Sequence, residues 1–178
     1  MIRLLLPVTL AVALLGSAHR APAQSTPLEI RAQLADHFDR SSRKIVTLAR
    51  AVPAELYTWQ PGDGVMSVAQ VYTHIARYNY LYLAESFGID APPGVDWPNF
   101  ESIAEKTRVL ELLERSVQHV RTSVAALDED ALTRSTLLYG RRVAGWAVLV
   151  QLVAHLNEHV GQSVAYARVN GIVPPWSR

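Results

Sequence analysis

Three histidines are the residues of this sequence whose types and spacing are best suited to chemistry. His155 and His159 lie four residues apart, and His74 lies in an earlier segment with a helical apolar pattern. Residues four apart share one side of a helix, and this side is otherwise apolar, so both imidazoles are expected to point inward. Three neutral imidazoles that meet in an apolar cavity form a natural ligand set for a divalent metal and leave positions open for water or substrate.

A packing role for the same histidines is the alternative. Each histidine taken alone is more typical of a core residue that is hydrogen-bonded to Tyr78, Tyr166 or a backbone carbonyl. The pattern does not by itself bring His74 to the other two, because that requires the second and fourth helices to be neighbours. His37 lies one position off an apolar stripe and His119 near a polar flank, so we expect both to have structural or surface roles.

Glu158 and Tyr78 are the candidate catalytic residues. The sequence from His155 to His159 also matches the inverted zincin protease motif, but that motif needs a carboxylate ligand well downstream. No Asp or Glu follows His159, which argues against such a peptidase. Glu158 then has two roles left open. In the first it serves the site, by accepting an imidazole N–H or by acting as a general base. In the second it is a carboxylate on the flank of the helix, paired with Arg77 or an arginine of the first helix. Tyr78 is a second group that could move a proton.

Four segments with helical periodicity must position these residues. We expect helices at about 28–52, 67–87, 101–127 and 144–169, with Ser67 and Gln70 as a capping box and Gly88 as a C-terminal stop. Residues 128–139 could hold a short helical turn, 140–142 indicate a turn, and the proline-containing tail is not expected to be helical. No strand pattern competes. The sequence therefore predicts an all-α four-helix bundle, with antiparallel helices as the default and one or two longer crossovers allowed by the connection lengths.

The N-terminal segment is predicted to be a secretory signal peptide over residues 1–23, which leaves residues 24–178 as the bundle domain. A basic start, an apolar run over residues 4–16 and the triplet Ala21-Pro22-Ala23 fit the cleavage pattern, and the run is too short to span a membrane. An uncleaved N-terminal anchor is the alternative. We therefore expect an exported protein, periplasmic or secreted, that is not membrane-bound after cleavage.

Composition narrows the chemistry further. The chain has no cysteine, which excludes a lipoprotein, disulfides and a thiolate ligand or nucleophile. Residues 1–23 contain two arginines and no acid, so cleavage changes the formal charge from +1 to −1. A near-neutral domain gives no electrostatic reason to expect nucleic acid as a partner. The aromatic run 78–82 must in part face solvent or another subunit, which suggests a homodimer.

The chain resembles the DinB-like superfamily of metalloenzymes over essentially its whole predicted mature domain. The resemblance rests on the order and helix placement of the three histidines and on several flanking stretches: residues 38–44, 59–61, 159–162 and 170–175. It implies a four-helix bundle with up-down-down-up connectivity. It also implies a divalent metal, commonly zinc or nickel, held by His74, His155 and His159. Relatives include transferases and isomerases that use low-molecular-weight thiols, but an oxidising exterior would deplete such cosubstrates.

Two functions from different classes therefore remain open. In the first, the protein is a metal-dependent hydrolase or thiol-transferase-like enzyme that acts on a small molecule, with Glu158 or Tyr78 moving a proton. In the second, the protein is a non-catalytic bundle in which the metal pins two helices and the surface binds a protein partner.

Overall fold

The computed structural model describes residues 25–177 and contains four long helices. They are α1 (Pro27–Ala51), α2 (Val68–Phe87), α3 (Lys106–Ala126) and α5 (Gly145–Val169). The shorter elements are η1 (Ala54–Leu56), η2 (Trp97–Ser102), α4 (Glu129–Thr133), β1 (Ser135–Leu138), β2 (Arg141–Ala144) and η3 (Pro175–Ser177). The predicted all-α bundle is confirmed.

The predicted signal peptide lies outside the described residues. Among the helices within 25–177, none has the length and apolar character needed to cross a membrane.

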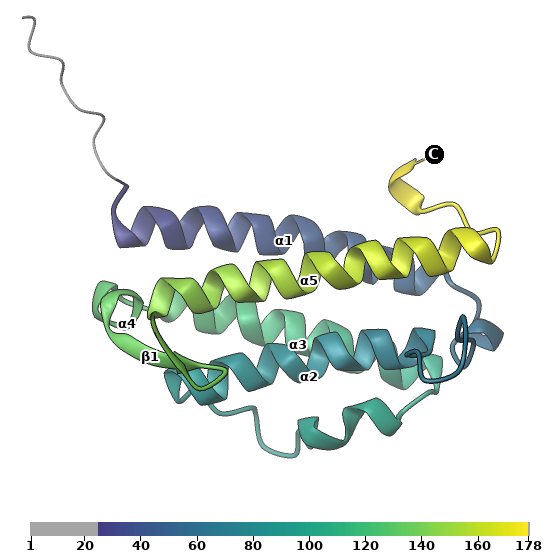
Figure 1. Ribbon diagram of the computed structural model, residues 1–178, viewed down its shortest axis with the longest axis horizontal. Helices are drawn as coiled ribbons and strands as arrows, with labels where there is room; N and C mark the ends of the chain where they lie inside the picture. The colour runs from purple at the N-terminus through teal and green to yellow at the C-terminus, as the bar shows by residue number, and fades with distance from the viewer. Residues whose placement is uncertain (1–24, 178) are drawn as a thin grey trace, which may run out of the picture.

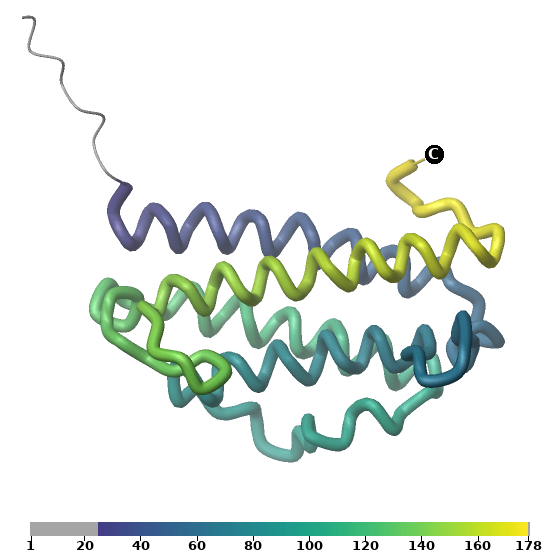
Figure 2. The backbone as a smooth tube through the Cα atoms, in the orientation of Figure 1, coloured from purple at the N-terminus to yellow at the C-terminus, as the bar shows by residue number. Residues whose placement is uncertain are grey.

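The four long helices have up-down-down-up connectivity. Figure 1 shows α1 and α5 side by side and running in one direction, while α2 and α3 run in the other. The connection between α2 and α3 passes along the bundle before α3 begins, as the tube in Figure 2 makes clear. The default of four antiparallel helices was therefore wrong, whereas the connectivity implied by the family resemblance is observed. This arrangement makes α2 and α5 neighbours, which the metal hypothesis required.

The boundaries of α2 follow from local capping. The Ser67 side chain accepts from the Gln70 N–H, and the Gln70 side chain accepts from the Ser67 N–H, so the predicted capping box is present. This exchange satisfies two backbone donors that a helix start would otherwise leave unpaired. At the other end Gly88 has φ 68°, a left-handed conformation that favours glycine, and its N–H bonds to the Ala84 carbonyl. The helix that carries His74 is thus fixed at both ends.

The helix α3 begins later than predicted. Its first residue is Lys106, because the Glu105 carboxylate accepts from the N–H groups of Thr107 and Arg108 and caps the helix there. Residues before it, Trp97–Ser102, form a separate 3-10 turn. Glu101 therefore lies in the connection, outside the third helix in which it was predicted.

The segment after α3 corrects the expectation that no strands occur. The strands β1 and β2 pair antiparallel, from Ser135 with Ala144 to Leu138 with Arg141. Tyr139 and Gly140 form the two-residue turn with φ 52° and 73°, the positive values that a type I′ hairpin requires. The turn thus lies slightly before the predicted residues 140–142. The predicted helical turn in 128–139 exists as α4, whereas the tail differs from prediction because Pro175–Ser177 form a 3-10 turn.

The aromatic run on α2 is mostly inside the molecule. Tyr80 and Tyr82 are each 1% exposed and Asn79 is buried, while Tyr78 and Leu81 are partly buried. Tyr80 packs against Phe100, a residue of η2 that covers this face. Tyr78 and Leu81 are the members of the run that are partly exposed, which fits the expectation that part of it faces solvent or a subunit, and the homodimer stays a prediction.

Two glycines of α5 provide a matched stability test. A Cβ at Gly145 would lie 2.0 Å from the Ala131 carbonyl oxygen, whereas a Cβ at Gly161 has nothing within 4 Å. We expect Gly145→Ala to lower the free energy of unfolding by about 2 kcal/mol through overpacking. Gly161→Ala should raise it by about 1 kcal/mol, since alanine is the better helix former. Urea denaturation of both variants measures the two effects, and equal changes would contradict the packing at Gly145.

Candidate metal centre

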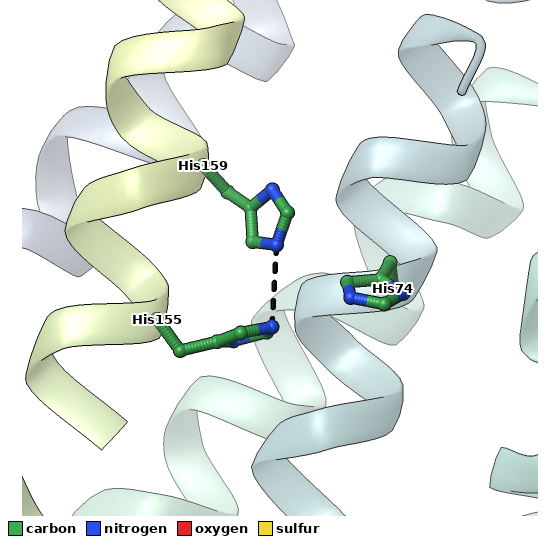
Figure 3. A group of neighbouring side chains, drawn as sticks. All are labelled: His74, His155 and His159. Carbon is green, nitrogen blue, oxygen red and sulfur yellow. Dashed lines mark hydrogen bonds between the residues drawn. The ribbon is translucent and has the colours of Figure 1, made fainter. Parts of the chain in front are cut away.

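The three predicted histidines converge between α2 and α5. His74 comes from α2, His155 and His159 from α5, and one ring nitrogen of each lies within 4.8 Å of the other two. Figure 3 shows the three rings turned toward one another across the gap between the two helices. His155 and His159 are each 7% exposed, while the His74 side chain is 14% exposed. The cluster is therefore buried, with its most accessible edge at His74.

The spacing of the two α5 ring nitrogens fits a metal. The Nε2 atoms of His155 and His159 are 3.2 Å apart. Zinc–nitrogen bonds of about 2.0–2.1 Å at tetrahedral angles place two ligating nitrogens about 3.3 Å apart. Two lone pairs that face each other at this distance repel unless a proton or a cation lies between them. The donor set, three imidazoles without thiolate, suits zinc, nickel and other divalent first-row metals.

A chain of hydrogen bonds fixes the protonation of His159. The Tyr166 hydroxyl lies 3.1 Å from the backbone carbonyl oxygen of Met66. A carbonyl oxygen can only accept, so the hydroxyl is the donor in this bond. That hydroxyl therefore accepts from the Gln162 Nε2 at 3.0 Å, which leaves the Gln162 Oε1 facing the His159 Nδ1 at 2.7 Å. An amide oxygen only accepts, so the Nδ1 of His159 carries the proton. Its Nε2, the atom that faces the cluster, is the unprotonated ligand atom.

Glu101 fixes which ring nitrogen of His74 carries the proton. The Nδ1 of His74 donates to the Glu101 carboxylate at 2.9 Å, and Arg77 bonds the same oxygen at 3.1 Å. Burial would raise the pKa of Glu101, but the hydrogen bonds from His74 and Arg77 outweigh it and lower the pKa below its ordinary value. A carboxylate behind a ligating histidine fixes the ring and makes the other nitrogen more basic.

Burial keeps the α5 pair neutral. It lowers the pKa of His155 from 6.5 to about 3, with further lowering from the neighbouring His159 and His74. Burial also lowers the pKa of His159, although the Gln162 hydrogen bond opposes it. Neutral imidazoles are the form that binds metal, so the pair needs no deprotonation near pH 7.

Aromatic rings hold His155 from the other side. Tyr78 packs on the rings of His74 and His155 with centroids 4.4 and 4.8 Å apart, and Tyr82 meets His155 edge-on. The Tyr82 hydroxyl accepts from Gln151 and is hydrogen-bonded to the hydroxyl of Tyr139 at the hairpin turn. The hairpin thus reaches the cluster through one tyrosine.

Of the two candidate catalytic residues, Tyr78 lies at the cluster and Glu158 does not contact it. Glu158 is exposed, and within residues 25–177 it forms no hydrogen bond or salt bridge with a histidine or arginine. Glu101 is a site carboxylate that the sequence pattern did not predict. It is 27 residues from His74 and was predicted as the first residue of the third helix, so no local signal paired it with His74. Gln162 and Tyr166, at helical spacing from His159, were expected from the sequence either to orient a ligand or to pack in the core, and they form the hydrogen-bond chain behind His159.

The other two histidines within residues 25–177 lie apart from the cluster. His37 is exposed on α1. His119 packs against Tyr80 with ring centroids 4.9 Å apart, and its buried Nε2 has no hydrogen-bond partner among the described residues. Their structural or surface placement agrees with what was expected.

Comparison with known proteins gives one consistent picture. A family model described as the DinB superfamily matches residues 37–163. A DinB-like protein from Bacillus cereus superposes with a TM-score of 0.66 at 15% identity, covering 81% of this chain and 95% of that one. A DinB-like protein from Bacillus subtilis gives 0.63 at 22% identity, with 79% and 93% covered. A conserved protein from Enterococcus faecalis gives 0.60 at 20% identity, with 77% and 94% covered. No curated protein matches the chain. These identities support the fold alone.

Proposed function

Because the chain belongs to the DinB superfamily, we propose that it binds one divalent cation, zinc or nickel, through the Nε2 atoms of His74, His155 and His159. The observation that carries the proposal is the orientation of the rings. Hydrogen bonds at the Nδ1 atoms of His74 and His159 leave both Nε2 lone pairs on the side of the cluster. A packing role would not require two independent hydrogen-bond networks that produce the same tautomer.

The function that follows is a metal-dependent reaction on a small molecule, either hydrolysis or transfer of a thiol. A cation bound by three histidines would supply Lewis acidity and lower the pKa of a water or thiol that joins it. The chain itself excludes water on the buried sides and holds the rings in place. Tyr78, in contact with two of the rings and partly exposed, is the group proposed to hold or move a substrate proton. Glu158, exposed and without a hydrogen bond to any of the three histidines, is not favoured for this role.

The predicted export of the protein bears on which reaction is favoured. We propose that residues 1–23 direct the chain to the periplasm or the exterior. Low-molecular-weight thiols are oxidised there, which favours hydrolysis over thiol transfer. A non-catalytic bundle that only holds the metal is the alternative outcome.

A pair of glutamate variants tests the proposal. Glu101→Gln keeps the shape of the side chain but removes the charge behind His74, and we expect it to weaken zinc affinity 10- to 100-fold. Glu158→Gln is the matched control and should leave zinc affinity unchanged. Chelator-competition titrations of the metal-free protein, with zinc and with nickel, measure the affinity and the stoichiometry, which we expect to be one metal ion for each chain.

The outcomes separate the alternatives. One equivalent in the native protein, weakened only by Glu101→Gln, supports the site, and turnover of ester, amide or thiol substrates by the loaded protein alone then supports catalysis. Absence of binding to the native protein would leave a packed bundle without a metal function. Equal weakening by both variants would show that overall charge, not the Glu101–His74 contact, governs affinity.

A further inference from the structure

A groove between α1 and α3 contains two adjoining compartments of different character. The first has a volume of about 220 Å³ and is closed on one side by α5. Its walls are mostly aliphatic and aromatic: Leu34, Phe38, Val120, Val124, Leu149 and Leu152. The second has a volume of about 370 Å³ and lies further along the same two helices. Its lining includes charged side chains: Arg43, Arg50, Glu114 and Arg121. The three histidines of the metal centre line neither compartment.

Arg121 marks the border, since it lines both compartments. Its Nε donates to the Asp39 carboxylate at 2.6 Å, and its Nη2 donates to the Ser42 hydroxyl at 3.2 Å. Ser42 is 1% exposed and its hydroxyl donates in turn to the Asp39 carbonyl at 3.0 Å. The guanidinium is therefore held in one place, and it retains N–H groups beyond those two bonds.

The second compartment has an excess of positive charge. Arg50 is paired with Glu114 at 2.8 Å, and Arg121 is paired with Asp39. Arg43 is exposed and forms no salt bridge with any residue in 25–177. An anion near Arg121 would thus meet a second, unpaired cation. Arginine side chains bind carboxylates and phosphates through paired N–H groups.

The size of the apolar compartment sets the length of chain that it can hold. A water molecule occupies about 30 Å³ of liquid, and a methylene group is similar in size. The compartment therefore holds about seven methylene groups.

We propose that this groove binds a single-chain amphiphile with an anionic head, of which a medium-chain fatty carboxylate is the simplest. The hydrocarbon chain would occupy the apolar compartment, and the head would lie at Arg121 and Arg43. An apolar wall that ends at the Asp39–Arg121 ion pair, followed by the unpaired Arg43, matches the apolar tail and then the charge of such a molecule in order. The proposal does not depend on the metal centre.

Calorimetric titration of the purified chain with octanoate tests the proposal. We expect saturable binding of one molecule, unchanged by a metal chelator. Hexanoate should bind about tenfold more weakly, because each buried methylene contributes about 0.8 kcal/mol. Octyl phosphate distinguishes the two anionic heads: tighter binding than octanoate points to an alkyl phosphate as the ligand, and weaker binding points to a fatty carboxylate. Octanoate binding that does not saturate, or an affinity for octanoate no higher than that for hexanoate, would overturn the proposal.

Three variants locate the binding. Arg43→Gln should weaken octanoate about fivefold and leave octanol unchanged, since only the former carries a charge. Arg115→Gln, on α3 but outside both compartments, is the matched control and should have no effect. Ala35→Leu, which fills part of the apolar compartment, should weaken octanoate and octanol alike. Arg43 is exposed, so its variant is expected to fold, and an unchanged octanoate affinity in both Arg43→Gln and Ala35→Leu would contradict the assigned site.

Discussion

Zinc at a thousandfold excess over its dissociation constant is expected to raise the free energy of unfolding of the stripped protein by about 4.1 kcal/mol. Zinc should not raise the free energy of unfolding of the double variant His155→Ala/His159→Ala. The reason is that the folded chain brings the three ring nitrogens within 4.8 Å, whereas the unfolded chain does not. Urea denaturation with and without zinc, on protein purified without a histidine tag, measures the difference. Elemental analysis of the same samples should give one equivalent for the native chain and none for the variant.

The control for this experiment is an exposed histidine elsewhere. His37→Ala removes an imidazole from the surface of α1 and should retain the full zinc-dependent gain. If the double variant is stabilised by zinc as much as the native chain, the metal binds elsewhere. If zinc does not stabilise the native chain, the three histidines have only a packing role.

Acid should destabilise the stripped protein through His155. An unfolded histidine takes up a proton below about pH 6.5, but the folded His155, with its pKa lowered to about 3, stays neutral. The unfolded state therefore binds more protons as the pH falls, and stability is lost between about pH 6.5 and 3. From pH 7.5 to 4.5 this one residue should cost about 3 kcal/mol of unfolding free energy. His159, whose pKa burial also lowers, adds to the loss.

Comparison with a variant isolates that contribution. His155→Gln has no ionisable group at this position, so its stability should fall about 3 kcal/mol less than that of the native chain over the same pH range. His37→Gln should follow the native chain. Urea denaturation of the three proteins in chelating buffer at both pH values gives the three differences. An equal loss of stability in His155→Gln and the native chain would mean that His155 is not buried in a neutral form.

The sequence predicted those parts of the fold and site that depend on local patterns. The capping box at Ser67 and the stop at Gly88 are signals that a few consecutive residues carry, and both ends of α2 lie where they indicate. The shared side of His155 and His159 follows from helical geometry. The meeting with His74 needed the connectivity, which only the family resemblance supplied.

The missed features all depend on contacts between distant segments. Glu101 reaches His74 because the connection before α3 folds back along α2, and nothing near Glu101 in the sequence encodes that path. The hairpin was missed because its strands have four residues each, too few for an alternating pattern to stand out. Its docking also comes from tertiary bonds, such as that from the Ser86 hydroxyl to the Leu137 carbonyl at 2.7 Å.

The position of the histidines along the chain has a consequence for chain entropy. His74 and His155 are 81 residues apart and lie on helices that meet only through the up-down-down-up connectivity. A cross-link that closes a loop of this length lowers the entropy of the unfolded chain by the equivalent of about 4.5 kcal/mol, as a disulfide would. A sequence without cysteine has no covalent means to this end. A cation shared by α2 and α5 would take the place of such a bridge for as long as its ligands stay attached, and it would open when they are protonated rather than when they are reduced.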